Sequence, residues 1–163
     1  MDLNKFTQKA QQAVVNAQGL ARDYGHQTIE PAHLLLALLN QSESTVPAVI
    51  SQIAGSTEVL RQEVQEDLAG RPKVYGAGTS EPGLSRPAAD ALDAAERYAK
   101  GMGDEYTSTE HILLGLTDSP EGKRLADYGI TKDAILKPKR STRGSQSITT
   151  QTPESTYQRL ENN

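Results

Sequence analysis

The side chains most able to do chemistry in this sequence are its histidines and one acid beside them. His33 and His111 each precede an apolar run, and Glu110 stands next to His111. A histidine beside a carboxylate suits acid–base catalysis, and paired histidines suit a metal ion. A metal site needs a third converging ligand. Glu110 precedes His111, but Ala32, which cannot bind a metal, stands at the matching place before His33. We therefore interpret each histidine as a nearly buried side chain that bonds a neighbouring loop, and we expect no metal.

The acids do not form a stronger catalytic motif. Asp104 and Glu105 lie in a loop ahead of an expected helix, and Thr107 with Glu110 fits a capping box at its start. The sequence lacks the phosphate-binding pattern G-x-x-x-x-G-K-[ST], the zinc-protease pattern H-E-x-x-H and the nucleophile pattern G-x-S-x-G. We predict that the chain is not an enzyme and needs no cofactor. An enzyme that uses His111 with Glu110 is the alternative.

The composition argues against several classes of protein. The 163 residues include no cysteine, which excludes a disulfide framework and a thiolate metal site. The formal net charge of −4 disfavours a nucleic-acid partner. No apolar run approaches the roughly 18 residues of a membrane span, and the first residues lack the apolar core of a secretion signal. This pattern is typical of a cytosolic protein with no nucleic-acid or membrane partner.

The helices that must position these side chains form a unit that occurs twice. Residues 84–117 align with residues 6–39 without a gap, at a constant offset of 78. Nine matched positions are identical: Ala10/Ala88, Ala13/Ala91, Ala17/Ala95, Ala21/Ala99, Gly25/Gly103, His33/His111, Leu35/Leu113, Leu36/Leu114 and Leu38/Leu116. The alanine pairs recur every three or four residues, which is the spacing of one helix face. A duplicated helical unit is therefore predicted.

Caps, prolines and apolar periodicity predict about eight helices in two sets of four. The expected helices cover residues 7–24, 31–40, 46–54, 57–69, 85–100, 108–117, 120–128 and 132–137. We assign repeat 1 to residues 1–69, a glycine- and proline-rich connector to 70–83, and repeat 2 to 84–137. The predicted fold class is all-α, a pseudo-two-fold duplication of a four-helix repeat, and no strand is expected.

Residues 138–163 differ in character from the rest of the chain. Pro138 is expected to end the eighth helix, because proline lacks the backbone N–H that a helix interior needs. The segment is rich in serine and threonine, and its larger apolar residues are only Ile148, Tyr157 and Leu160. Such a composition buries too little apolar surface to offset the entropy of ordering. A flexible linker or tail is predicted.

Two stretches carry a family resemblance: NKFTQKAQQAVVNAQGLARDYGHQTIEPAHLLLALL at 4–39 and GDEYTSTEHILLGL at 103–116. They resemble the N-terminal domain of ClpB-type AAA+ disaggregases, within the Clp N-domain repeat family. The resemblance covers about residues 1–137 and resumes over 144–157 as linker. It implies an all-α pseudo-dimer that a mobile linker tethers to ATPase rings.

The resemblance also implies a function. The domain would be a substrate-recruiting module that weakly binds unfolded or aggregated polypeptide through an apolar groove. The full-length protein would form a homohexamer that cooperates with a DnaK-type chaperone, and the isolated domain would be monomeric. The chain ends at Asn163, where the first ATPase module would begin. The alternative is therefore a stand-alone adaptor or regulator of a Clp machine.

Carried over by position, the resemblance implies a polypeptide-binding site made of Thr7, Leu92, Ala94, Asp104, Glu110 and His111. Ala94 and His111 stand where some relatives have leucine, so the groove is expected to be shallower or more polar here. Ala94, Asp104 and Glu110 are positions at which the two repeats differ. Mismatches between the repeats are therefore expected to indicate function better than matches do.

Overall fold

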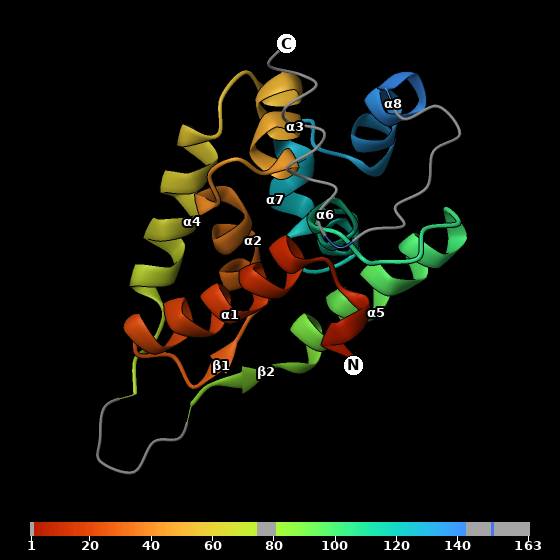
Figure 1. The fold of residues 1–163 in the computed structure, drawn as a ribbon. Helices are drawn as coiled ribbons and strands as arrows, with labels where there is room; N and C mark the ends of the chain where they lie inside the picture. The colour runs from red at the N-terminus through yellow and green to blue at the C-terminus, as the bar shows by residue number, and fades with distance from the viewer. Residues whose placement is uncertain (1, 75–80, 143–150, 152–163) are drawn as a thin grey trace.

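The computed structural model describes residues 2–74, 81–142 and 151, and these fold as a duplicated helical domain (Figure 1). Repeat 1 holds α1 (Gln8–Asp23), β1 (Thr28–Ile29), α2 (Pro31–Asn40), α3 (Thr45–Ala54) and α4 (Glu58–Gly70). Repeat 2 holds β2 (Gly83–Leu84), α5 (Arg86–Gly101), α6 (Thr109–Thr117), α7 (Gly122–Asp127) and α8 (Lys132–Thr142). The all-α, doubled architecture is confirmed. None of the described helices is long and apolar enough to cross a membrane.

Helices α1 and α5 begin in the same way and bury the same kind of stripe. The Thr7 Oγ1 accepts the N–H of Ala10 at 3.2 Å, and the Ser85 Oγ accepts the N–H of Ala88 at 3.2 Å. Both helices are thus capped as predicted. Their inward stripes are buried alanines: Ala10, Ala13, Ala17 and Ala21 in α1, with Ala88, Ala91, Ala95 and Ala99 in α5. Small side chains let a second helix approach each of them closely.

Helices α2 and α6 form the centre of the molecule. All residues from Pro31 to Leu39 in α2, and from Thr109 to Leu116 in α6, are buried. Contacts join α2 to α6, α2 to α5 and α1 to α6, across the two repeats. In Figure 1, α4 borders α2 on one side, and α6 stands beside α7. One hydrophobic core therefore serves both repeats.

In each repeat, the segment before the long first helix pairs with the segment before the buried second helix of the other repeat. β1 pairs with β2 in parallel, which sets Ile29 opposite Leu84, and these two strands lie side by side in Figure 1. An isolated parallel bridge joins Phe6 to Thr107, and the 78-residue offset converts one pairing into the other. The expectation of no strand was wrong, because a two-residue pairing is too short to leave an alternating pattern. The interlock fixes the pseudo-two-fold.

The predicted end of the eighth helix at residue 137 was also wrong. Helix α8 continues through Pro138 to Thr142. An interior proline removes one hydrogen bond and costs about 3 kcal/mol, but the preceding turn is anchored. Ile135 is buried, Leu136 is half-buried, and α8 contacts both α3 and α6. The packing of α8 against α3 and α6 therefore outweighs the helix-breaking tendency of Pro138.

Other parts of the predicted connector and tail are only partly described. Residues 75–80, 143–150 and 152–163 lie outside the described residues. Gln151 is described, and its carbonyl accepts the backbone N–H of Gln8 at 2.8 Å. One backbone N–H in the first turn of α1 is therefore hydrogen-bonded to a residue far along the sequence.

Candidate functional site

His111 lies at the start of α6 in a buried network. Its Nδ1 accepts the backbone N–H of Ser108 at 2.8 Å, so the ring proton lies on Nε2, which donates to the Asp104 Oδ2 at 2.8 Å. The Ser108 Oγ lies 3.0 Å from Nδ1 and accepts the N–H of His111. Serine, histidine and aspartate also form nucleophile triads. Here the hydroxyl caps a helix and is buried, so the network holds the loop that leads into α6.

His33 occupies the matched network in repeat 1, with a different partner. Its Nδ1 accepts the N–H of Glu30 at 2.8 Å, and its Nε2 donates to the Nδ1 of His26 at 2.8 Å. Burial lowers the pKa of His33 to about 4, with a smaller effect from His26. Burial likewise lowers the pKa of His26. Both rings are therefore neutral at pH 7.

The histidine prediction is confirmed, because each ring bonds the loop before its own helix. The predicted capping box of Thr107 with Glu110 was wrong. Ser108 is the N-cap residue, and His111 takes the role that a glutamate usually plays three positions later. Glu110 is buried in the first turn of α6 instead. Among the residues with described side chains, no group of three histidine or acidic side chains could hold a metal.

The structure buries all six residues of the predicted polypeptide-binding site. Thr7 caps α1, and Leu92 lies in the hydrophobic core. Asp104 and His111 are in contact with each other. Ala94, at 4% exposed, lines a groove on the surface of repeat 2. The six residues thus do not share one exposed surface.

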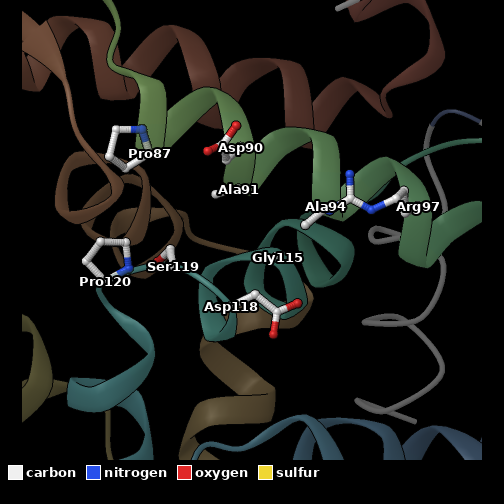
Figure 2. Close-up of a pocket in the computed structure, with 9 residues that line it drawn as sticks. All are labelled: Pro87, Asp90, Ala91, Ala94, Arg97, Gly115, Asp118, Ser119 and Pro120. Atoms are coloured by element: carbon white, nitrogen blue, oxygen red, sulfur yellow. The ribbon is translucent and has the colours of Figure 1, made fainter.

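The groove runs along the line where α5 crosses α6 and has a volume of about 330 Å³. Figure 2 shows side chains of α5 along one wall, with the end of α6 and the following turn opposite. Its lining comprises Pro87, Asp90, Ala91, Ala94, Arg97, Gly115, Asp118, Ser119 and Pro120. Alanines, prolines and a glycine supply the apolar part, and the charges stand around them. We call this feature the α5–α6 groove.

Gly115 determines how closely the two walls approach. A Cβ placed at Gly115 would lie 2.2 Å from the carbonyl oxygen of Ala91 and 3.0 Å from the nitrogen of Ala95. No side chain fits in that space. The matched residue in repeat 1 is Ala37, and α1 packs less closely on α2 than α5 does on α6. Only in repeat 2 is a bare backbone needed at this crossing.

The matched crossing in repeat 1, where α1 meets α2, differs because side-chain hydrogen bonds join α1 to the residues that follow α2. The Lys9 Nζ donates to the Ser42 carbonyl at 3.3 Å, and the Gln41 Nε2 donates to the Lys9 carbonyl at 2.8 Å. At the same offset, repeat 2 has Pro87 in place of Lys9. It also has Ser119 and Pro120 in place of Gln41 and Ser42. Pro87 has no side-chain donor to replace that of Lys9, and the Ser119 hydroxyl donates to the Leu116 carbonyl at 2.7 Å instead of crossing to α5. The side-chain bonds of repeat 1 therefore have no counterpart among the described residues at the α5–α6 crossing.

The charged residues of the groove are exposed and partly paired. Asp90 Oδ1 lies 3.2 Å from the Arg86 Nε. Tyr98 donates its hydroxyl to the Asp118 Oδ2 at 2.6 Å. Burial and this hydrogen bond raise the pKa of Tyr98. Arg97 adds one cation at the opposite end of α5 from Pro87 (Figure 2).

A second charged cluster joins α4 to α7, and so joins the repeats. The Arg124 guanidinium contacts the Glu121 carboxylate at 2.8 Å, the Glu63 carboxylate at 3.4 Å, and Asp67. Arg71 also bonds Asp67 at 2.9 Å. The hydrogen bond from Arg71, followed by that from Arg124, lowers the pKa of Asp67 to about 2. These charges satisfy one another, so we assign the cluster a structural role.

The groove residues other than Ala94 were missed by the sequence reasoning. A signal for them existed, because Pro87, Gly115 and Asp118 are mismatched with Lys9, Ala37 and Asn40 in repeat 1. A mismatch in sequence does not show whether the residue lies on the exposed surface or at the crossing of two helices. Only the packing of α5 on α6 makes the distinction.

The duplicated four-helix domain with this interlock defines a known class of helical repeat domain. The chain belongs to the Clp repeat (R) N-terminal domain family, whose model matches residues 5–126. It is 37% identical over 165 residues to the chaperone protein ClpB of Clostridium tetani, and 36% identical over 163 residues to that of Mycobacterium tuberculosis. These alignments cover 98% and 99% of the chain but 19% of each relative. The chain thus spans about a fifth of their length.

Solved structures share the fold. The N-terminal domain of Hsp104 from Candida albicans superposes with a TM-score of 0.75 at 24% identity, over 93% of this chain and 99% of that one. The N-domain of ClpV from Vibrio cholerae gives a TM-score of 0.71 at 17% identity, over 91% and 90%. A complex of a ClpV N-domain with a VipB peptide gives 0.65 at 18% identity, over 91% and 92%.

Proposed function

We propose that this chain is the substrate-recruiting N-terminal module of a ClpB-type chaperone. It weakly binds unfolded or aggregated polypeptide and passes it to an ATPase ring. The family membership and the ClpB relatives support the chaperone role. The ClpV N-domain that was solved with a VipB peptide supports peptide binding by this fold. In a full-length protein, the module would act on a homohexamer that cooperates with a DnaK-type chaperone.

The proposed binding surface is the α5–α6 groove. The observation that carries this choice is the contrast between the repeats. In repeat 1, side-chain hydrogen bonds between Lys9 and residues 41 and 42 cross the line where α1 meets α2. In repeat 2, Pro87 and Ser119 stand in place of Lys9 and Gln41 and make no such bonds across the groove. Of the six residues that the family resemblance implied, Ala94 is the one in this lining. The other five would then act by shaping the domain around the groove.

Such a groove suits weak capture. A segment that covers about 400 Å² of apolar surface would gain about 10 kcal/mol. Association and the ordering of the peptide would cost about 4–15 kcal/mol. Where that cost lies near its lower end, a net gain of about 4–6 kcal/mol remains, which corresponds to a dissociation constant on the order of 0.01–1 mM. Weak sites become effective when several are displayed on one ring, because effective concentration rises, and weak binding also allows release.

A reciprocal exchange at one matched position tests the proposal. Ala94→Asn places the polar residue of repeat 1 in the groove, whereas Asn16→Ala makes the reverse change at an exposed site of α1. We expect Ala94→Asn to weaken binding of a reduced, carboxymethylated polypeptide by about fivefold or more, since the apolar floor is lost. Asn16→Ala should change it less than twofold. Titrations followed by NMR measure both, and circular dichroism checks that each variant is folded.

Equal effects of the two substitutions would contradict the proposal. So would an unchanged affinity in a folded Ala94→Asn variant, because the groove would then not contact the polypeptide.

A further inference from the structure

Two carboxylates line the α5–α6 groove from opposite sides. Asp90 projects from α5, and Asp118 stands at the end of α6, with Ala91 and Ala94 also on the α5 wall (Figure 2). Both carboxylates are on exposed residues, so a ligand can reach them without a change in the fold. An apolar segment that lay in the groove would therefore run between two negative charges.

The matched positions of repeat 1 carry no charge. Gln12 stands where repeat 2 has Asp90, and Asn40 stands where it has Asp118. Asn40 has nearly the same shape as Asp118, and Gln12 is one methylene longer than Asp90, so both pairs differ in charge and one also differs in length. The acidic groove is thus specific to repeat 2, like the prolines and the glycine that form it.

The cations nearby reduce this negative charge without removing it. Arg86 pairs with Asp90 at 3.2 Å, but both side chains are largely exposed, and such pairs are weak. Asp118 accepts a hydrogen bond from the neutral Tyr98 hydroxyl, which leaves its charge in place. The Lys132 Nζ lies 4.8 Å from the centre of the Tyr98 ring, so this exposed cation offsets part of the charge of Asp118. Arg97 lies toward the far end of the groove from Pro87 (Figure 2). A bound cation would therefore be favoured away from Arg97.

We propose that the α5–α6 groove selects polypeptide segments in which lysine or arginine flanks a short apolar stretch. This selectivity rests on the proposed function, because it describes the ligand of the same groove. The apolar stretch covers Ala91, Ala94 and Gly115, and the flanking cations pair with Asp90 and Asp118. Segments flanked by glutamate or aspartate are disfavoured by like-charge repulsion.

Three peptides with one apolar sequence test the selectivity. They carry lysine, glutamine or glutamate on both flanks, with a fluorophore at the same end, and anisotropy reports binding to the 163-residue chain. Exposed charge pairs contribute modestly, so the lysine peptide should bind about 3- to 10-fold more tightly than the glutamate peptide at 20 mM salt. The difference should fall below about twofold at 0.5 M salt, where charges are screened.

Variants that copy repeat 1 supply the matched control. Asp90→Gln and Asp118→Asn together should remove most of the preference for the lysine peptide, whereas the binding of the glutamine peptide should stay within about twofold. Asp93→Asn removes the same kind of charge from an exposed position of α5 outside the groove lining and should leave the preference intact.

The outcomes separate this inference from the proposed function. Equal binding of all three peptides, which Ala94→Asn weakens, would overturn the selectivity and keep the groove. A preference that Asp93→Asn removes as fully as the groove variants do would also overturn it, because net charge would then explain it. No binding of any peptide would contradict the proposed function itself.

Discussion

Repeat 1 and repeat 2 have the same long helix against the same buried helix, yet the seam between those helices differs. In repeat 1, Lys9 and Gln41 bond across it, and Ala37 separates the helices. In repeat 2, Gly115 brings α5 against α6, and prolines border a groove of about 330 Å³. The comparison teaches that one copy closes the line between its two helices with side-chain bonds, while the other leaves a groove there, which we propose as the binding surface.

The largest expected effect tests the close approach at Gly115. Gly115→Ala should destabilise the chain by about 3 kcal/mol, because the new Cβ would overlap the Ala91 carbonyl and force the helices apart. The matched control is Ala37→Gly in repeat 1, which should cost about 1–2 kcal/mol through backbone entropy and the loss of one buried methyl group. Urea unfolding measures both. A cost below 1 kcal/mol for Gly115→Ala would show that the two seams are equally tolerant and would break the comparison.

A smaller effect, on pH dependence, sharpens the contrast between the histidine networks. Because the pKa of His33 is lowered from 6.5 to about 4, the unfolded chain binds the proton first as the pH falls. This group's contribution to stability is complete above pH 6.5 and is lost toward pH 4, about 2 kcal/mol by pH 5. Urea unfolding at pH 7 and pH 5 measures the loss.

The variant His26→Asp gives His33 the kind of partner that Asp104 gives His111. A carboxylate stabilises the protonated ring, so at least 1 kcal/mol of the loss between pH 7 and pH 5 should disappear. An unchanged loss in a folded variant would mean that acid sensitivity arises elsewhere.

Much of the fold could be predicted from local signals. The alanine stripes, the caps Thr7 and Ser85, and the proline at the start of α2 each act within one or two helix turns, and each prediction was confirmed. The misses were of another kind. Pro138 remains helical because α8 is anchored through Ile135, and the pairing of Phe6 with Thr107 joins residues far apart in the sequence. Local rules do not include such contacts.

The candidate site was less predictable than the fold. The family resemblance implied six residues, and the structure places one of them, Ala94, in the groove lining. The groove depends on Gly115, Pro87 and Pro120, whose effect arises only where two helices cross. Mismatches in the repeat alignment included these residues, but many mismatches change only the exposed surface. A helix crossing has to be known before the two kinds can be separated.

The central claim, that repeat 2 binds polypeptide and repeat 1 does not, has a direct test. The ¹⁵N-labelled chain is titrated with a reduced, carboxymethylated polypeptide, and amide chemical shifts are mapped at matched positions. The account predicts saturating shifts over residues 88–97 and 115–119, with small or no shifts over the matched residues 10–19 and 37–41. Equal shifts in both sets, or shifts confined to repeat 1, would contradict it.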